Sequence, residues 1–244
     1  MKNIIKLINI NFSAQGRDII QGVSVEFTAG IATAIVGPSG GGKSTVLKIS
    51  AGLLLPSNGD VLYKERSVAN MNRDENLEFR RESAFVFQDS ALWANQDLNQ
   101  ILELPLKIHY PKMTAKDRMN RIKEITEEVG YRKDLDIRPS RLSMGEQKLI
   151  GFARALLCNP SLLFLDEWTE SLDEAQANRL IKIVRNKVKN GASVIFICHD
   201  MRIMNELAEH VIIVSNGAIV MDARKEEIAN NAELSNYLRM GMAL

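Results

Sequence analysis

The sequence predicts an α/β fold with a mainly parallel core sheet and an α-helical insertion. Three short apolar runs, 31–36, 162–165 and 193–198, have the length and the residue types of buried strands, and helical stretches such as 173–190 separate them. Strands that alternate with helices are typical of a parallel sheet covered by helices. Residues 89–157 lack strand signals and become helical, so we expect them to form the insertion.

Local signals place the other elements along the chain. In order, we expect two short strands around a polar turn at 14–18 (4–27), a helix (44–54), an edge hairpin (61–68), a strand (83–88), a helix (201–208) and a hairpin (211–220). Asn216-Gly217 is a strong turn signal for the last hairpin. Inside the insertion, Thr114 followed by Asp117 resembles a helix capping box. Apolar residues then follow at helical spacing: Met119, Ile122, Ile125 and Val129.

Composition limits the possible classes of protein. With 45% hydrophobic and 25% charged residues, the 244 residues suffice for one large domain or two small ones with a sizeable core. The formal net charge of +1 argues against a strongly basic nucleic-acid binder, so no nucleic-acid partner is expected. Cys158 and Cys198 form no paired motif, which suits a reducing cytosol. No run approaches the roughly 18 apolar residues of a membrane span, and residues 1–10 lack the anatomy of a signal peptide.

A glycine-rich turn follows the first buried run. The segment Gly37-Pro-Ser-Gly-Gly-Gly-Lys-Ser44 fits the P-loop pattern at every fixed position. Glycines let successive N–H groups point at one oxyanion, and the following helix adds its positive N-terminal end. A flexible glycine turn is the alternative, but the position between a buried strand and a helix favours a phosphate cradle for ATP. The expected cradle residues are Gly37, Ser39, Gly40, Gly41, Gly42, Lys43, Ser44 and Thr45.

Side chains of the cradle also predict a place for a metal ion. Lys43 can reach the β- and γ-phosphates, and the Ser44 hydroxyl can hold Mg²⁺. The apolar strand at 162–165 ends in two acids, and ligands of open α/β sheets bind at the carboxyl ends of strands. We expect Asp166 to bind Mg²⁺ through a water and Glu167 to act as general base or water positioner. Two acids alone would more often form a solvated turn.

Four further segments complete an ordered set of motifs. They are Val86-Phe87-Gln88, Leu142-Ser-Met-Gly-Glu-Gln147, Ser171-Leu172-Asp173 and His199-Asp200. With the P-loop and the acidic strand end, they resemble the motifs of the ATP-binding cassette of ABC transporters, in that family's order and over essentially the whole chain. There they correspond to the Q-loop, the signature segment, the D-loop and the switch histidine.

This resemblance implies a P-loop NTPase cassette with a mainly parallel core sheet, an antiparallel β subdomain and an inserted helical subdomain. The ATP-binding core would comprise 1–88 and 158–244, and the signature subdomain 89–157. Gln88 would contact Mg²⁺ and the attacking water, and His199 would sense the γ-phosphate. Because the signature segment lies away from the cradle, two copies would pair head to tail around two nucleotides. The residues implied in that shared site are Ser143, Gly145 and Asp173.

Each of these residues also has a simpler structural interpretation. Gln88 alone would more often be a surface residue, and His199 a core or capping group. Ser143 is also a candidate helix N-cap, with Glu146 completing a capping box, and a capped helix N-terminus is itself an anion site. For the family's adenine-stacking aromatic, the nearest candidate is Phe12, which reads equally well as a core residue; the strict position is Ala14.

The chain departs from the family pattern at three positions. Met144 replaces a glycine of the signature segment, where it would either crowd a closed dimer or point away and leave the Gly145 N–H free. Trp168 stands where the family has a proline. Cys198 stands where Thr or Ser is common, and a buried structural thiol is favoured there over a redox switch.

The resemblance also implies a separate integral membrane permease as partner, and a cytoplasmic protein peripheral on the inner membrane. Trp93 would contact that partner or pack inside the insertion. Residues 97–106 and 236–241 are similar to cassettes of Mla/Mce-type systems, which move phospholipids or other lipids. Two alternatives are a soluble non-transport relative and a cassette that clamps ATP without hydrolysing it; Met144 is the only feature favouring the clamp.

Overall fold

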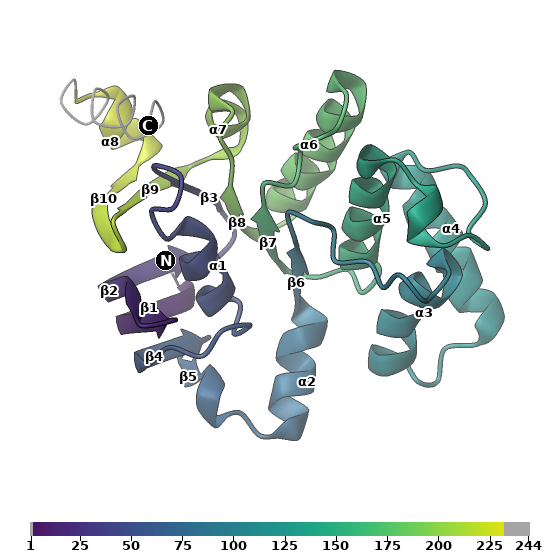
Figure 1. Ribbon diagram of the computed structural model, residues 1–244, viewed down its shortest axis with the longest axis horizontal. Helices are drawn as coiled ribbons and strands as arrows, with labels where there is room; N and C mark the ends of the chain where they lie inside the picture. Colours follow the sequence, from purple (N-terminus) through teal and green to yellow (C-terminus); the bar gives the residue numbers. More distant parts are fainter. Residues whose placement is uncertain (1, 232–244) are drawn as a thin grey trace.

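The computed structural model describes residues 2–231 and contains two sheets (Figure 1). The larger has the strand order β10-β9-β3-β8-β7-β6. Its five strands from β9 to β6 are parallel, and β10 pairs antiparallel at the edge, so the mainly parallel core sheet is confirmed. The strands are β3 (Ala32–Val36), β6 (Ser83–Val86), β7 (Leu162–Asp166), β8 (Ser193–Ile197), β9 (His210–Ser215) and β10 (Ala218–Arg224).

The smaller sheet is antiparallel, with the order β2-β1-β4-β5. Its strands are β1 (Asn3–Ala14), β2 (Arg17–Thr28), β4 (Asn58–Tyr63) and β5 (Arg66–Ser67). The expectation of two short strands within 4–27 was wrong, because each of these strands has 12 residues. The expected turn at 14–18 shrinks to Gln15 and Gly16, whose positive φ angles of 53° and 74° allow a tight reversal.

Eight α-helices occur in the described part of the chain: α1 (Lys43–Ser50), α2 (Arg73–Glu82), α3 (Leu98–His109), α4 (Ala115–Val129), α5 (Met144–Leu156), α6 (Glu174–Lys189), α7 (Met201–Leu207) and α8 (Lys225–Ala229). Two short 3₁₀ turns, Val68–Asn70 and Pro139–Arg141, accompany them. Helix α1 ends four residues before the expected boundary at 54, and Gly52 follows with a φ of 61°. Helix α2 was not expected, although Asn72 and Glu75 form a full capping box at its start.

The stretch 89–157 contains helices α3, α4 and α5 and no strand, as expected for the insertion. Two details of α4 differ from the expectation. Met119 is exposed, whereas the other apolar residues of the stripe, Ile122, Ile125 and Val129, are buried. The Thr114 hydroxyl accepts the Asp117 N–H at 3.2 Å, but it donates to the Asp117 carboxylate, so only half of the capping box forms. The boundaries at 88 and 158 stay a prediction.

Side chains of the central sheet point alternately into two hydrophobic clusters. In β7, Leu163 and Leu165 pack with α3 to α7, whereas Leu162 and Phe164 pack with α1 and the antiparallel sheet. The strand period of two residues separates them. In Figure 1, α1 and the antiparallel sheet accordingly lie on one side of the large sheet. No helix in the range 2–231 has the length and apolarity to cross a membrane.

Candidate active site

The turn between β3 and α1 requires glycine at two positions at least. Gly37 has a φ of 140°, and a Cβ atom there would lie 2.0 Å from the main-chain oxygen of Val214. Gly42 has a φ of 104°, and its Cβ would lie 2.8 Å from Cδ1 of Ile20. The first N–H groups of α1, which begins at Lys43, have no partner within the helix. The turn therefore has the tight glycine backbone that a phosphate cradle needs, with Ser39 and Gly40 exposed at its tip, and the phosphate-binding role of its residues stays a prediction.

Lys43 is folded into this cradle. Its ammonium donates to the main-chain oxygens of Gly37 at 2.9 Å and Pro38 at 2.8 Å, and only 6% of the residue is exposed. Burial lowers the pKa of Lys43, and the nearby carboxylates of Glu167 and Asp166 act against that shift. The Lys43 ammonium therefore lies inside the turn, against the main-chain oxygens of its first two residues.

Ser44 and Asp166 form the oxygen pair expected of a metal site. The Ser44 hydroxyl donates to Oδ1 of Asp166 at 3.1 Å, and Asp166 is only 2% exposed at the end of β7. Burial raises the pKa of Asp166, and the hydrogen bond from Ser44 opposes this. A hydroxyl and a carboxylate are hard oxygen donors that suit Mg²⁺, which keeps several waters and takes few protein ligands. Accordingly, no group of three or more His, Cys, Asp or Glu in the described chain has the arrangement of a metal cluster.

Glu167 receives contacts from the ends of two neighbouring strands. Gln88, after β6, donates from Nε2 to Oε2 of Glu167 at 2.6 Å, and His199, after β8, places Nε2 3.0 Å from Oε1. Glu167 itself has a φ of 43°, an unfavourable conformation for a residue with a side chain. Such strain gathers at functional sites. The three residues predicted to be catalytic thus lie together.

Two residues at this place were not expected. Glu170 accepts a hydrogen bond from Nε2 of Gln88 at 3.2 Å. Lys148, from α5, is buried and donates to the main-chain oxygens of Gln88 and Glu167. Burial lowers the pKa of Lys148, while the carboxylate of Glu170 most strongly opposes that shift. Neither belongs to a fixed motif position that the sequence signals.

The signature segment forms the start of α5. Ser143 caps the helix: its hydroxyl accepts the Glu146 N–H at 3.2 Å, and the Glu146 side chain accepts the Ser143 N–H at 2.9 Å. The predicted capping box is therefore confirmed. A Cβ on Gly145 would lie 3.1 Å from the main-chain oxygen of Ser171, so α5 packs closely on the D-loop. Asp173 is likewise the N-cap of α6 and accepts the Gln176 N–H at 2.7 Å.

A hollow of about 470 Å³ joins the metal pair to the signature helix. Ser44 and Asp166 line it on one side, and Met144 and Ser171 line it as well. Met144 is 72% exposed, so its side chain extends from the helix start. The hydrogen bonds of Ser143 in the described chain stay within its own helix turn.

Phe12 lies in β1, close to the glycine-rich turn. It is half-buried in β1, packs against the cluster that contains α1, and pairs with Ile20, the neighbour of Gly42. Both the core reading and the adenine reading remain predictions, and Ala14 pairs with Arg17 at the end of the same strand. Cys198 is buried, and burial raises its pKa to about 12, which suits an inert structural thiol.

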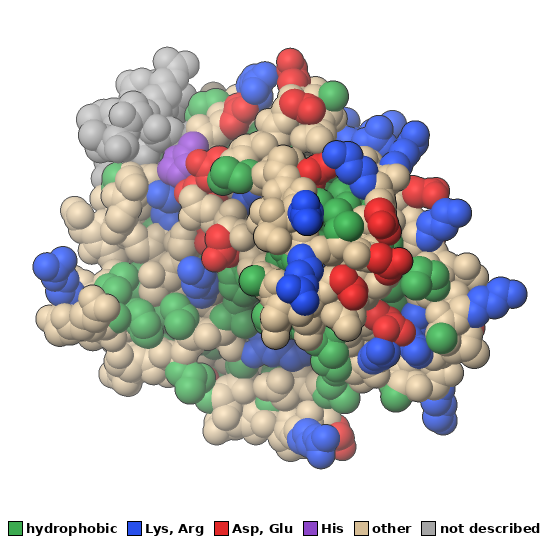
Figure 2. All heavy atoms as spheres, turned by 45° about the vertical axis from the view of Figure 1, so that its right-hand side comes forward, with side chains coloured by type: hydrophobic (Ala, Val, Ile, Leu, Met, Phe, Trp, Pro, Cys, Tyr) green, Lys and Arg blue, Asp and Glu red, His purple; other side chains and the backbone are tan. Residues whose placement is uncertain are grey.

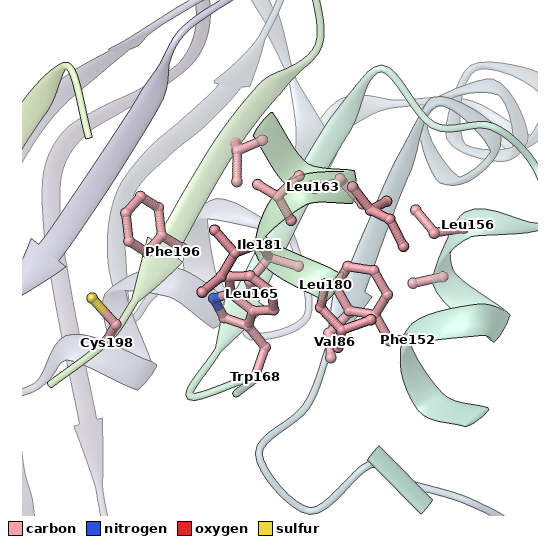
Figure 3. Close-up of a cluster of buried hydrophobic side chains, with 14 of the residues drawn as sticks. Val86, Phe152, Leu156, Leu163, Leu165, Trp168, Leu180, Ile181, Phe196 and Cys198 are labelled. Atoms are coloured by element: carbon pink, nitrogen blue, oxygen red, sulfur yellow. The ribbon is translucent and has the colours of Figure 1, made fainter. Parts of the chain in front are cut away.

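Trp168 directly follows Glu167 in the chain, and its side chain lies in the hydrophobic core. It is fully buried and stacks on Phe152 of α5, with ring centroids 5.6 Å apart and an interplanar angle of 25°. Figure 3 shows the indole among Leu165, Leu180 and Phe152. Its Nε1–H has no hydrogen-bond partner in the described structure. The residue replaces a proline of the family pattern with a large apolar contact between β7 and the signature helix.

A glycine-rich turn between a buried strand and a helix, with a buried aspartate at the end of a nearby parallel strand, defines a P-loop nucleotide-binding protein. A family model described as ABC transporter matches residues 20–170. The nickel import ATP-binding protein NikE of Shigella flexneri serotype 5b (strain 8401) is 34% identical over 211 residues, which cover 84% of this chain and 78% of that protein. The chain therefore belongs to the ABC transporter family and is an ATP-binding, ATP-hydrolysing subunit of that family.

Other comparisons agree. The L-cystine import ATP-binding protein TcyC of Bacillus subtilis (strain 168) is 28% identical over 223 residues, 90% of each chain. A dimeric post-hydrolysis structure of the ATP-binding cassette MJ0796 with ADP and Pi has a TM-score of 0.83 at 26% identity, covering 90% of this chain and 98% of that one. An ATP-binding subunit of an ABC transporter with 19% identity and a TM-score of 0.85 supports the fold, so the predicted cassette fold is confirmed.

Proposed function

We propose that this chain powers a membrane transporter, and that two copies close head to tail around two molecules of ATP to do so. The observation that carries the proposal is the position of Glu167 between Gln88 and His199, beside the Ser44–Asp166 pair. This geometry provides a water-activating carboxylate next to a phosphate cradle and a metal site. The proposed location is the cytoplasmic face of a bacterial inner membrane.

The P-loop residues bind the nucleotide in this proposal. Main-chain N–H groups of residues 39–45 and the Lys43 ammonium bind the β- and γ-phosphates, and exchange of carbonyl contacts for phosphate contacts keeps Lys43 paired. Ser44, Asp166 and the oxygen of the Gln88 amide hold Mg²⁺. Bound there, Mg²⁺ would supply positive charge against the negative charge that develops during phosphoryl transfer.

Hydrolysis depends on the orientation of Glu167. Its carboxylate accepts from Gln88 at one oxygen and lies next to the His199 ring at the other, so its direction is fixed by two strand ends. A carboxylate held in this way can orient a water for in-line attack on the γ-phosphate and accept its proton. His199 also contacts the γ-phosphate and senses its presence, because the contact with Glu167 holds the imidazole ring beside the carboxylate that faces this phosphate.

A second copy completes the site. The start of α5 presents a capped, exposed helix N-terminus at Ser143, the kind of end that binds anions. In this proposal, Ser143 and the N–H of Gly145 bind the γ-phosphate held by a partner copy, and the D-loop residue Asp173 belongs to the same shared site. The dimeric structures of MJ0796 support such pairing. Met144 extends from the same end and lies in the closed interface.

The membrane partner docks on a groove of about 340 Å³ beside the Q-loop. Its walls include Leu53, Phe85, Phe87 and the 46% exposed ring of Trp93. Lysine, arginine and acidic side chains are interspersed over the face that carries the helical insertion (Figure 2), so apolar contact rather than net charge selects the partner. Arg154 of α5 donates to the main-chain oxygens of Ala91 and Ser90, which connects the groove to the signature helix.

The proposed cargo class is phospholipid or another lipid. Its support is the similarity of residues 97–106 to cassettes of lipid systems; the second similar segment, 236–241, lies outside the described residues. In the first segment, Leu98, Ile101, Leu102 and Leu106 are buried, so packing alone accounts for part of the likeness. The curated relatives named above import nickel and L-cystine, which makes a small solute the competing cargo.

Complementation between two inactive variants tests the shared site. Lys43→Ala disables the cradle and Ser143→Arg blocks the signature end, so neither variant alone should hydrolyse ATP. A mixture contains pairs in which the intact cradle of one chain meets the intact signature of the other, and it should regain part of the activity. A mixture as inactive as its components would contradict the head-to-tail dimer. Turnover that is independent of protein concentration would do the same.

Affinity purification from solubilised membranes tests the transporter role. The tagged chain should retain an integral membrane protein, and Trp93→Ala should weaken that retention while leaving ATP binding intact. Lipid bound to the complex, identified by mass spectrometry, would support the lipid cargo, whereas stimulation by nickel or an amino acid would contradict it. A soluble partner would favour the non-transport alternative, and a complex that binds but never cleaves ATP would favour the clamp.

A further inference from the structure

A buried lysine of α5 joins the two segments that carry Gln88 and Glu167. Lys148 is 3% exposed, although it carries an ammonium group. Its Nζ donates to the main-chain oxygen of Gln88, and to the main-chain oxygen of Glu167 at 3.3 Å. One side chain of the signature helix therefore contacts both catalytic segments at once.

These two contacts lie just beyond the end of the sheet. Parallel pairing of β6 with β7 ends at Val86 and Leu165. Gln88 and Glu167 each lie two residues further along, past the last pair of that register. Beyond this last pair, the Lys148 ammonium connects the backbones of Gln88 and Glu167 in place of the main-chain hydrogen bonds of the sheet. Two main-chain hydrogen bonds, with Ile197 and Glu170, already hold Glu167 at its φ of 43°, and Lys148 adds a third contact at the Glu167 main-chain oxygen.

The side chain of Gln88 is held from the other direction. Its Nε2 donates to Glu167 at 2.6 Å and to Glu170 at 3.2 Å. Lys148 binds the backbone of the same residue. Both ends of Gln88 are thus fixed, which directs the amide oxygen away from the two carboxylates.

Stability alone gives a poor account of Lys148. Both hydrogen-bond acceptors of the ammonium are neutral carbonyl oxygens. The carboxylates of Glu170, Glu167, Asp166 and Asp89 offset only part of the cost of moving the charge out of water, because the pKa of Lys148 is still lowered by burial. A methionine has similar length and could fill the space without that cost, and such replacements of buried charges are often neutral or stabilising. The ammonium is better explained by what it holds in place.

We propose that Lys148 is a positioning residue for ATP hydrolysis, which fixes Gln88 and Glu167 relative to each other and to the N-terminal end of α5. This inference rests on the proposed function, in which that end of α5 binds the partner's nucleotide. Movement of α5 then reaches both catalytic segments through one side chain. The Trp168–Phe152 stack gives α5 a second contact with the chain just after Glu167 (Figure 3).

The first experiment compares Lys148→Met with Lys123→Met in the full-length chain. Lys123 is an exposed lysine of the neighbouring helix α4, so its substitution controls for loss of one positive charge. We expect Lys148→Met to lower kcat by about 10- to 100-fold, the scale of a small misplacement of catalytic groups. ATP affinity should stay unchanged, and the melting temperature should stay equal or rise. Lys148→Arg, which keeps the charge and can donate to both carbonyls, should retain much of the turnover.

The second experiment requires no turnover. The chain has two tryptophans, so Trp93→Phe leaves Trp168 as the only indole. Acrylamide quenching of Trp168 fluorescence then reports on the segment just after Glu167. Adding Lys148→Met to this background should increase quenching without a change in melting temperature, because the segment loosens locally.

The outcomes separate the possibilities. Wild-type turnover by Lys148→Met, an equal loss in Lys148→Arg and Lys148→Met, or quenching that rises only with a general loss of stability would each overturn the positioning role. Absence of turnover in the wild type and in Lys123→Met alike would contradict hydrolysis itself. The quenching measurement would still decide the role of Lys148 in that case.

Discussion

The Nε2 atom of His199 lies 3.0 Å from Oε1 of Glu167, although 32 residues separate them in the sequence. The contact exists because β7 and β8 are parallel neighbours, so that both residues emerge at the same edge of the sheet. Gln88 reaches the other carboxylate oxygen from β6. The direction of one carboxylate therefore depends on three adjacent strand ends, and this dependence leads to the first prediction.

Glu167→Gln should arrest hydrolysis and retain nucleotide binding. The substitution keeps the size of the side chain and removes the charge, so turnover should fall by about 10²- to 10⁴-fold, the usual contribution of a general base. Phosphate release measures turnover, and a fluorescent ATP analogue measures affinity. Glu174→Gln, at an exposed position of α6, is the control and should behave as wild type. Undiminished turnover would remove Glu167 from the catalytic role.

Lys43→Ala should weaken ATP binding itself. The ammonium is buried at the turn, and loss of a charged hydrogen-bond donor to phosphate costs about 1.5–3 kcal/mol, roughly 10- to 100-fold in Kd. Isothermal titration with ATP and Mg²⁺ measures this change. Lys123→Ala serves as the matched control on an exposed surface. An unchanged Kd for Lys43→Ala would contradict the cradle assignment.

Gly37→Ala should destabilise the fold as well as the site. Its Cβ would approach the main-chain oxygen of Val214 to 2.0 Å, so β9 and the turn must move apart. We expect a loss of about 3 kcal/mol in the free energy of unfolding. Gly40→Ala offers a comparison: its φ of 72° is also left-handed, but nothing lies within 4 Å of the added carbon. That variant should lose only about 1 kcal/mol in urea unfolding.

Glu146 should make stability depend on pH. Its contacts with Lys133 and Ser143 hold the pKa of the carboxyl below its ordinary value of 4.5. A depressed pKa stabilises the fold above 4.5, and this contribution is lost as the pH falls through the folded value. Glu146→Gln should therefore cost about 0.5–1 kcal/mol at neutral pH and little in acid. A stability difference that grows in acid would reverse the assigned sign.

Trp168→Ala should be among the most destabilising substitutions. The ring is fully buried against Phe152, and truncation of a buried aromatic costs about 3–5 kcal/mol. Trp93→Ala provides the control within the same chain, because that ring is 46% exposed and should cost much less. Equal melting temperatures for the two variants would contradict the packing described for Trp168.

The fold was predictable where residues of the core sheet lie in continuous apolar runs. The parallel strands β3, β7 and β8 are buried along their whole length, so composition alone identifies them. Helix α2 escaped prediction because Phe79 is its only buried residue, which leaves no apolar period. The length of β1 was missed for another reason. It pairs with both β2 and β4, and a shift in register at Asn9, which has a φ of 48°, lets one strand continue across the polar residues.

The residues of the candidate site could be predicted where they belong to one short, continuous sequence motif. The cradle and the acidic strand end are recognisable because one short segment supplies several groups with fixed spacing. Glu170 and Lys148 were missed because their contacts depend on tertiary structure: Lys148 meets the oxygen of Gln88 from 60 residues away. The sequence signal was a lysine among the apolar residues of a predicted helix. It could be recognised only by knowing which residues of α5 face the protein interior.

The two hydrophobic clusters that share the central sheet have a consequence for how this protein evolves. Helices α3 to α7 and the helix behind the P-loop pack on alternate residues of the same strands, such as Leu163 and Phe164. Substitutions that reshape one face therefore leave the packing of the other largely intact. In evolution, side chains on the insertion side of a strand can therefore vary without direct changes to the contacts around α1 and the nucleotide-binding turn.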